Sequence, residues 1–220
     1  MTLGHHTLPA RSGRTQSLVV LLHGFGSNGA AMLGLAKTLS IALPNTAFLA
    51  PDAHDPAPGR PGGRMWFTIP KLGGSSAVEA DLRLQASARQ LDAFLDDQLA
   101  AHGLPASAMA LLGFSQGAGM AYEVGPRRRD QLAGVVAIAG RMKRNETLAA
   151  EVRSHPPFLM MTGAEDHLLT EDEITQTRTA LSQVSIPAMR IIMAGVGHSV
   201  SDDGLATASD FLKSVLPRVT

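Results

Sequence analysis

The chain has 220 residues, of which 45% are hydrophobic, and its 19 basic residues balance 19 acidic ones. This length and composition fit a single domain over residues 1–220 with a substantial core, and the zero net charge argues against a surface for nucleic acid or anionic lipid. The absence of cysteine excludes disulfides, a thiolate nucleophile and a cysteine-bound metal, and it fits a reducing compartment.

The first residues of the chain lack a basic start followed by an apolar block, so we expect no signal peptide. His5 and His6 are expected to lie in a tail. No apolar run approaches the roughly 18 residues that are needed to cross a bilayer. These features predict a cytoplasmic protein that does not span a membrane.

Six short apolar runs recur along the chain, and most of them lack the alternation of apolar and polar residues that a half-exposed strand shows. Unbroken apolar runs are typical of parallel strands that helices cover on both faces. The runs predict strands at residues 18–22, 46–50, 108–112, 134–139, 157–162 and 188–193.

Helical patterns with clear start and stop signals lie between these runs. Ser76 and Glu79 have the spacing of a capping box, which opens a helix that Gly103 ends. Thr170 and Glu173 repeat the signal before a second helix. A third helical pattern lies near the C-terminus, before Pro217. The predicted apolar face of the first helix is Leu84, Ala88, Leu91, Leu95 and Leu99, that of the second is Ile174, Thr177, Leu181 and Val184, and that of the third is Leu205, Ala208, Leu212 and Val215. Because strands and helices alternate, we expect an α/β fold with a mostly parallel sheet.

Residues 51–76 interrupt this alternation with a concentration of proline and glycine. A long irregular segment in a compact domain is either functional or disordered. The segment contains Met65, Trp66 and Phe67, and three large apolar side chains need neighbours to pack against. We therefore expect an ordered loop that partly covers a functional site.

A serine in the context of a nucleophile follows the third apolar run. Residues 113–117 read Gly-Phe-Ser-Gln-Gly, and a helical pattern over 118–124 then stops at residues 125–126. In a sharp turn from strand to helix the hydroxyl group is exposed, and the glycines leave room where the two elements come close. Ser115 is therefore the candidate nucleophile. The three arginines at 127–129, after the stop, are expected to form a solvated turn.

A serine nucleophile needs a base, and the base needs a carboxylate that orients it. In sheets of this type the chain order is nucleophile, acid and histidine, each just after the C-terminal end of a strand. Asp166 follows the run at 157–162 by a short turn, and His198 follows the run at 188–193 by a comparable one. We therefore expect Ser115, Asp166 and His198 to form a catalytic triad.

Other acids and histidines fit this pattern less well. Glu165, Asp172 and Glu173 are alternative acids, but the last two lie in a first helical turn, where carboxylates favour the helix dipole. His54 lies in the irregular segment, and His167 neighbours the acid itself. No His-x-x-x-His or His-Glu-x-x-His spacing occurs, so we expect no metal.

The tetrahedral intermediate of such a reaction needs two donors for its oxyanion. One is expected from the backbone N–H of Gln116, directly after the nucleophile, and the other from the N–H of Phe25 in the glycine-rich loop after the first run. His23, at the start of that loop, is expected to be a buried structural histidine that bonds to the loop backbone.

Taken together, these motifs resemble the α/β-hydrolase family of small carboxylesterases, acyl-protein thioesterases and lysophospholipases. The resemblance covers nearly the whole chain and rests on residues 23–26, 66–67, 113–117, 162–166 and 197–199. It implies the α/β-hydrolase fold, the triad and oxyanion donors named above, no cofactor, and an acyl pocket beside Met65, Trp66 and Phe67. The sequence departs from the family at residues 139–143, which read Ala-Gly-Arg-Met-Lys where relatives often read Ser-Gly-x-Leu-Pro, and at Thr162, where relatives often have histidine.

The expected reaction is hydrolysis of a carboxylic ester, an acyl-thioester or a lysophospholipid of short to medium acyl length through an acyl-enzyme. Only 17 residues separate the strand ending at residue 139 from the one beginning at residue 157, so no large lid domain fits between them. A serine peptidase, an acyltransferase or a noncatalytic binding protein on the same fold are the alternatives. The sequence is compatible with a homodimer but does not define the oligomeric state.

Overall fold

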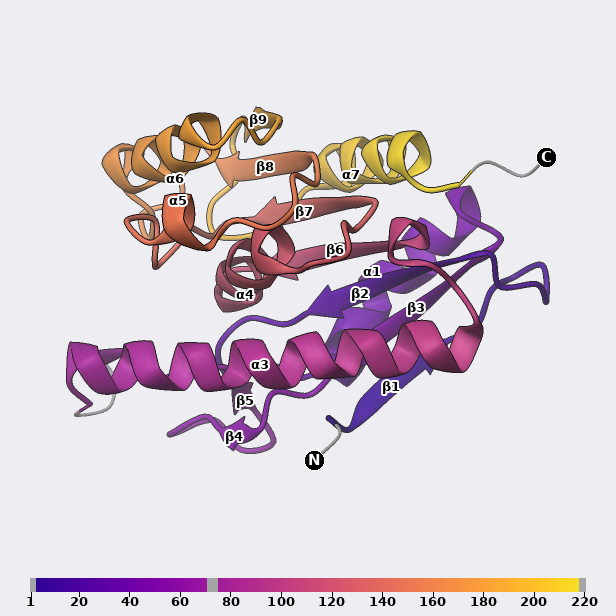
Figure 1. Cartoon of the computed structure of the whole chain (residues 1–220), viewed down its shortest axis with the longest axis horizontal. Coiled ribbons are helices and arrows are strands. Elements are labelled where there is room, and N and C mark those ends of the chain that lie inside the picture. The colour runs from indigo at the N-terminus through magenta and orange to yellow at the C-terminus, as the bar shows by residue number, and fades with distance from the viewer. Residues whose placement is uncertain (1–2, 71–74, 218–220) are drawn as a thin grey trace.

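The computed structural model describes residues 3–70 and 75–217, which contain a seven-stranded sheet with the order β1-β3-β2-β6-β7-β8-β9 (Figure 1). β1 pairs antiparallel with β3, and the other neighbouring strands are parallel. The bounds are β1 (His5–Leu8), β2 (Ser17–Leu22), β3 (Thr46–Pro51), β6 (Met109–Phe114), β7 (Gly134–Ile138), β8 (Phe158–Gly163) and β9 (Ala188–Met193). The mostly parallel sheet is confirmed, and the six predicted strands are displaced by two residues at most.

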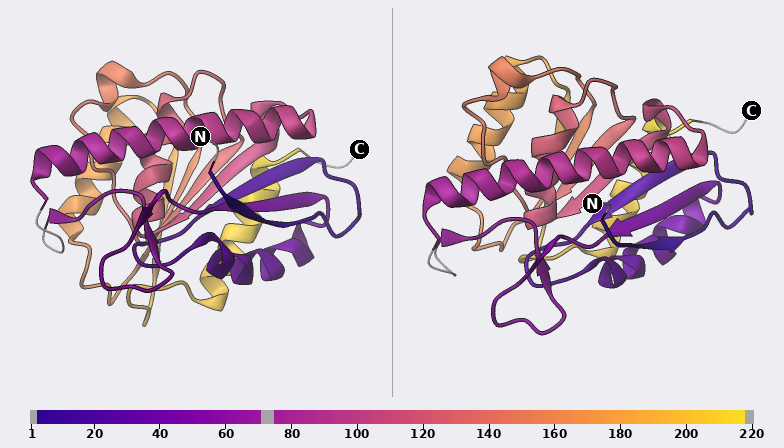
Figure 2. Two further views of the ribbon diagram at one scale, coloured as in Figure 1. Left: turned by 90° about the horizontal axis from the view of Figure 1, so that it is seen from below. Right: turned by 60° about the horizontal axis from the view of Figure 1, so that its bottom comes forward.

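Helices cover both faces of this sheet. Figure 2 shows α3 crossing one face while α1 and α7 lie on the other. The helices are α1 (Gly29–Ala42), α3 (Ala77–His102), α4 (Gln116–Val124), α5 (Leu148–Glu151), α6 (Glu171–Gln183) and α7 (Asp202–Val215), with short 3₁₀ turns η1 (Ala106–Ala108) and η2 (Gly125–Arg127). A small hairpin of β4 (Asp55–Pro56) and β5 (Arg64–Met65) lies within the proline- and glycine-rich segment.

Two apolar cores lie on the two faces of the sheet, because successive side chains of a strand point to opposite faces. On β2, Val20 and Leu22 pack in the core under α3 and α4, whereas Val19 and Leu21 pack in the core under α1 and α7. All residues of β2 are buried, which explains why its sequence is apolar without interruption from residue 18 to residue 22.

The helix ends follow the predicted signals with one difference. At α6 the side chain of Thr170 and that of Glu173 close both halves of a capping box. At α3 the Ser76 hydroxyl accepts a hydrogen bond from the Glu79 N–H at 3.1 Å, but the Glu79 carboxylate accepts one from Arg83 Nε at 3.3 Å. Only half of the predicted box therefore forms at α3.

The prediction of a tail at His5 and His6 is wrong, because both residues belong to β1. Their side chains alternate between exposed and half-buried at the edge of the sheet. An edge strand of this kind is held by backbone pairing with β3, so its sequence needs no apolar run.

The prediction of a solvated turn at 127–129 is wrong for two of the three arginines. The side chains of Arg127 and Arg128 are only 13% and 4% exposed. Carboxylates of α3, α4 and α5 face the two guanidinium groups. The partners are Glu123 and Glu151 for Arg127, and Asp92 and Asp96 for Arg128.

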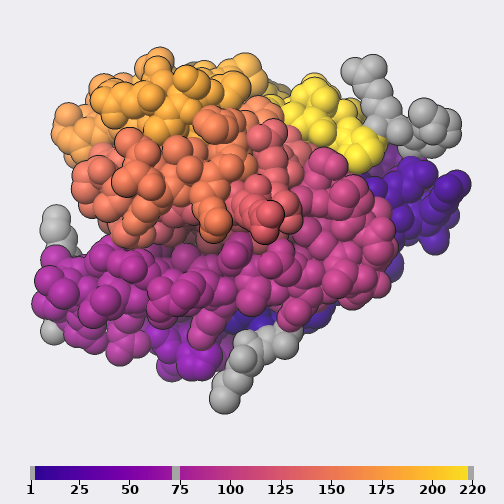
Figure 3. All heavy atoms as spheres, in the orientation of Figure 1, coloured from indigo at the N-terminus to yellow at the C-terminus, as the bar shows by residue number. Residues whose placement is uncertain are grey.

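Residues 139–157, between β7 and β8, contain only the four-residue helix α5, which confirms that no large lid domain follows β7. Figure 3 shows this segment, in orange, lying directly beside the magenta α3. Within residues 3–70 and 75–217, no helix combines the length and the apolar character that crossing a membrane requires.

Gly117 is expected to tolerate no side chain. A Cβ atom there would lie 2.1 Å from the carbonyl oxygen of Leu22, because α4 passes the end of β2 backbone to backbone. Rotation of a side chain cannot relieve this overlap, so we expect Gly117→Ala to lower the free energy of unfolding by about 3 kcal/mol or more. Urea denaturation measures the change.

Gly34→Ala is the matched control, because a Cβ at this position of α1 would meet no described atom within 4 Å apart from its chain neighbours and the nearby backbone of its own helix. This variant should raise the free energy of unfolding by roughly 0.5–1 kcal/mol, since alanine favours a helix over glycine. Equal effects of the two substitutions would contradict the packing argument.

Candidate active site

Ser115 lies in the sharp turn between β6 and α4, and its backbone is unusual. Its φ and ψ angles are 55° and −113°, and φ is rarely positive in a residue other than glycine. The Ser115 N–H donates to the carbonyl of Ile138 at 2.8 Å. A Cβ on Gly113 would lie 2.3 Å from the carbonyl oxygen of Gly117, so the close approach predicted for these two glycines is confirmed.

The loops after β6, β8 and β9 bring three polar side chains into one hydrogen-bonded line. His198 Nε2 lies 2.8 Å from Ser115 Oγ, and His198 Nδ1 lies 2.8 Å from Asp166 Oδ2. The Asp166 side chain is 1% exposed, and its Oδ1 accepts a hydrogen bond from the Leu168 N–H at 2.9 Å. A carboxylate only accepts, so the proton lies on His198 Nδ1 and Nε2 is left to accept from the serine hydroxyl.

The loops that carry Asp166 and His198 are bound to each other through their backbones. The N–H groups of Ala164 and Glu165 donate to the carbonyls of Met193 and Val196, each at 2.9 Å. A Cβ on Gly163 would lie 2.1 Å from the Val196 carbonyl oxygen. The acid and the histidine are therefore held together before any substrate arrives.

The alternative acids and bases make other contacts. Asp172 accepts a hydrogen bond from Gln176, and Glu173 completes the cap of α6. His54 pairs with Asp55 at 2.9 Å, while Glu165 and His167 are exposed. Within the described part of the chain, no group of three or more His, Cys, Asp or Glu side chains is arranged to hold a metal ion.

The glycine-rich loop after β2 lies directly beside the serine. A Cβ on Gly24 would lie 3.3 Å from the Cβ of Ser115. The backbone N–H groups of Phe25 and Gln116, the two predicted oxyanion donors, make no hydrogen bond to another residue of the described ranges. Both amides are thus available to an acceptor from outside the chain.

His23 holds the start of this loop, and its predicted structural role is confirmed. The side chain is fully buried, Nδ1 donates to the Gly24 carbonyl at 2.8 Å, and Nε2 accepts from the Ala53 N–H at 3.1 Å. Burial lowers the pKa of His23 below its ordinary value of 6.5. The imidazole is neutral in this arrangement, because a proton on Nε2 would face the Ala53 N–H.

We expect His23 to make the fold less stable in mild acid. Because the pKa of His23 is lowered in the folded protein, the unfolded chain binds a proton at a higher pH than the folded chain does. The contribution of His23 to the free energy of unfolding therefore keeps its full value above pH 6.5 and decreases as the pH falls below 6.5. The loss between pH 7.5 and pH 5.5 is at most about 1.4 kcal/mol.

Urea denaturation at the two pH values measures this loss. His23→Gln cannot gain a proton, and its free energy of unfolding should therefore fall less over this interval than that of the unsubstituted protein. Equal slopes for the two proteins would contradict the assignment.

Met65, Trp66 and Phe67 are ordered but buried, with exposures of 8%, 1% and 5%. The side-chain amide of Gln116 spans their backbone, since Oε1 accepts from the Trp66 N–H at 2.8 Å and Nε2 donates to the Phe67 carbonyl at 2.6 Å. Trp66 Nε1 donates to the His23 carbonyl at 3.0 Å. The predicted acyl-binding role of the three residues stays a prediction.

The sequence pattern did not reveal this side-chain role of Gln116. Its bonds join positions about 50 residues apart, and neither periodicity nor local spacing reports such a pair. The only signal was the position of the glutamine directly after the serine.

Comparison with known proteins identifies the family. Residues 4–216 match the family model described as Phospholipase/Carboxylesterase. The chain is 25% identical to Esterase YpfH of Escherichia coli (strain K12) over 218 residues, covering 97% of this chain and 89% of that protein. It is 26% identical to Acyl-protein thioesterase 1 of Debaryomyces hansenii over 219 residues, covering 92% of this chain and 93% of that protein.

The crystal structure of esterase PE8 is similar to this chain over nearly the whole length of both proteins. The two chains are 36% identical with a TM-score of 0.91, and the match covers 98% of this chain and 100% of the other. The sheet order, the covering helices and this match together define the α/β-hydrolase fold. The chain therefore belongs to the phospholipase/carboxylesterase family.

Proposed function

We propose that the chain hydrolyses carboxylic esters or thioesters of short to medium acyl length through an acyl-enzyme on Ser115. The observation that carries this proposal is the continuous hydrogen-bonded line from Ser115 through His198 to Asp166, with 2.8 Å at each step. Membership of the family and the esterases and acyl-protein thioesterases among the relatives support the same class of reaction.

The chemistry begins when Ser115 Oγ attacks the acyl carbonyl and His198 Nε2 takes up the hydroxyl proton. His198 then donates this proton to the departing alcohol or thiol, which leaves the acyl group on the serine. A water molecule, activated by the same imidazole, attacks the acyl-enzyme and releases the acid. Asp166 keeps the imidazole in the required tautomer and stabilises its positive charge.

The oxyanion of each tetrahedral intermediate is proposed to accept hydrogen bonds from the N–H groups of Phe25 and Gln116. Both amides lack an acceptor within the described residues, and the loop of Phe25 packs against the serine. Loss of one such donor costs about 3 kcal/mol in the barrier, or roughly a hundredfold in rate.

A panel of 4-nitrophenyl esters, acyl-thioesters and lysophospholipids tests the substrate class. No large lid follows β7, so we expect an accessible site and the highest kcat/KM with short to medium linear acyl chains. A maximum with long-chain triglycerides would contradict the proposed acyl length. The same panel separates ester, thioester and lysophospholipid preference.

Two experiments address the alternative functions. Reaction of the protein with a fluorophosphonate probe should label a serine covalently, and absence of labelling would favour a noncatalytic binding protein. Comparison of an ester with the isosteric amide distinguishes an esterase from a peptidase, and product analysis with added alcohol detects acyl transfer.

The assembly and location of the protein stay predictions. A homodimer is tested by sedimentation velocity, a single domain over residues 1–220 by limited proteolysis, and a cytoplasmic location by cell fractionation.

A further inference from the structure

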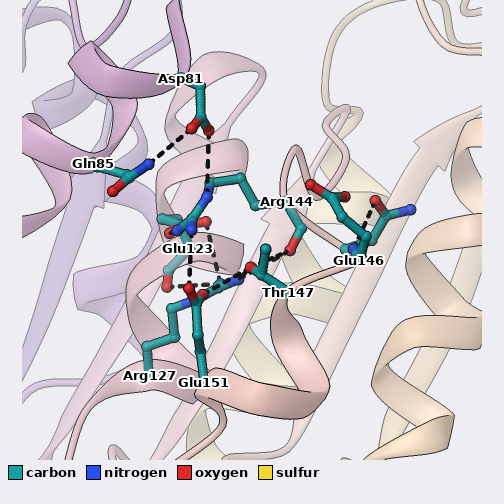
Figure 4. A network of polar contacts seen from close by, with 9 residues as sticks. Asp81, Gln85, Glu123, Arg127, Arg144, Glu146, Thr147 and Glu151 are labelled. Carbon is teal, nitrogen blue, oxygen red and sulfur yellow. Dashed lines mark hydrogen bonds and ion pairs between the residues drawn. The ribbon is translucent and has the colours of Figure 1, made fainter. Parts of the chain in front are cut away.

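Four charged side chains form a closed ring of ion pairs at the end of α4 that lies away from the serine (Figure 4). Arg144 binds Glu123 through Nη1 at 2.7 Å and Glu151 through Nη2 at 2.9 Å. Arg127 binds Glu151 through Nε at 2.6 Å and lies 3.1 Å from Glu123 through Nη1. We call Glu123, Arg127, Arg144 and Glu151 the charged ring.

Three of the four side chains of the charged ring are largely shielded from solvent, and Glu151 is 34% exposed. The side chain of Glu123 is 3% exposed, and the two arginines are 13% and 14% exposed. Burial raises the pKa of Glu123, and the charges of Arg127 and Arg144 oppose this shift. A carboxylate buried in this way depends on its partners, so removing one of them disturbs the whole ring.

The ring joins two stretches that are separate in the chain, namely α4 with η2 and residues 139–157 between β7 and β8. Glu123 lies on α4 and Arg127 on η2 directly after it, Arg144 lies in the segment after β7, and Glu151 lies on α5. Arg127 Nη2 also donates to the backbone carbonyl of Arg144 at 2.9 Å, so the ring fixes the main chain of that segment as well as its side chain. Asp81 of α3 adds a contact of 3.3 Å to Arg144 Nε.

The other end of the segment after β7 contacts the serine directly. Ala139 has a φ of 52°, which turns the chain sharply. A Cβ on Gly140 would lie 2.6 Å from the carbonyl oxygen of Ser115 and 2.5 Å from the Cβ of Ala118. Residues 139–144 are therefore pressed against the nucleophile turn at one end and held by the charged ring at the other.

We propose that the charged ring positions Ser115 for reaction by holding residues 139–144 against its backbone and by fixing the far end of α4. Arg144 is the central positioning residue, because it is the member of the ring that lies within residues 139–144, whose Gly140 packs against the serine turn. This inference rests on the proposed role of Ser115 as the nucleophile.

Arg128 offers a matched control for Arg144. Both arginines have carboxylate partners and little exposed side chain, 4% for Arg128 and 14% for Arg144, and Arg128 binds Asp92 and Asp96 of α3. The hydrogen bonds and ion pairs of Arg128 lead to α3 and to Val124 and none leads to residues 139–147. If the ring serves only the stability of the fold, neither Arg144→Met nor Arg128→Met should change kcat well below its melting temperature.

The test measures the melting temperatures of Arg144→Met and Arg128→Met. It then measures kcat and KM for a 4-nitrophenyl ester and the second-order rate of fluorophosphonate labelling, at a temperature well below the melting temperature of either variant. We expect both variants to lose melting temperature. Only Arg144→Met should lose about tenfold or more in kcat and labelling rate with little change in KM, because a misplacement of about 1 Å costs on the order of a hundredfold. Arg144→Lys, which keeps one charge, should recover part of the loss.

Unchanged kcat in Arg144→Met, or an equal loss of kcat in Arg128→Met, would overturn the inference. The ring lines an open cavity of about 470 Å³ between α3 and residues 150–153, so a shorter side chain at position 144 leaves no sealed void. If Arg144→Met nevertheless fails to fold, Glu151→Gln, at a more exposed position of the ring, decides by the same criteria. Failure of the proposed function is distinguishable, because the unsubstituted protein would then show no ester turnover and no labelling, or Ser115→Ala would retain both.

Discussion

Ser115→Ala is expected to reduce kcat for a 4-nitrophenyl ester on the order of a millionfold, as removal of the nucleophile does in other serine hydrolases. The hydroxyl that the variant lacks is the one 2.8 Å from His198 Nε2, and no acyl-enzyme can form without it. The fold should be unaffected, because the alanine keeps the Cβ and the backbone angles of the turn. Steady-state kinetics and loss of fluorophosphonate labelling measure the effect.

Ser199→Ala provides the control for this substitution. Ser199 is an exposed serine next to His198 in the chain, and its backbone N–H donates to the Gly197 carbonyl at 2.9 Å. We expect it to keep kcat within a factor of about two, as surface substitutions do. Activity in Ser115→Ala comparable to that of Ser199→Ala would refute the assignment of the nucleophile.

Asp166→Asn is expected to lower kcat roughly 10⁴-fold with little change in folding. The asparagine can place its amide NH₂ toward His198 Nδ1, which puts the imidazole proton on Nε2 and prevents it from accepting the serine proton. If the amide adopts the flipped orientation instead, its NH₂ faces the Leu168 N–H, which in the unsubstituted protein donates to Asp166 Oδ1. Either orientation therefore loses one of the two hydrogen bonds that the carboxylate accepts.

Glu165→Gln tests the specificity of that effect, since Glu165 is an exposed acid directly beside Asp166. It should leave kcat nearly unchanged across neutral pH. An equal loss in both variants, or activity of Asp166→Asn within tenfold of the unsubstituted enzyme, would contradict the proposed role of the acid.

The buried parallel strands could be predicted from the sequence because burial on both faces leaves a signal within a few neighbouring residues. Five of the six apolar runs correspond to the buried strands β2, β3, β6, β7 and β8, and the sixth corresponds to β9, an edge strand that is partly exposed. The candidates Ser115, Asp166 and His198 could be found because each follows such a run. The parallel topology then brings them to the same edge of the sheet.

The features that could not be predicted depend on pairs of residues distant in the chain. β1 has a polar sequence and is defined by its pairing with β3. Arg127 and Arg128 looked like a solvated turn because charge alone suggests exposure, and their acidic partners on α3, α4 and α5 are apparent only in three dimensions. The hydrogen bonds of the Gln116 side chain to the backbone of residues 66 and 67 likewise join positions that are distant in the chain.

The contact at Gly163 has a consequence for protein engineering. The loop that carries Asp166 and the loop that carries His198 contact each other through main-chain atoms at this glycine. A single loop taken from another hydrolase would therefore not fit the loop that remains. Recombination that seeks new substrate preferences should therefore exchange the two segments together, or keep both and vary the chain elsewhere.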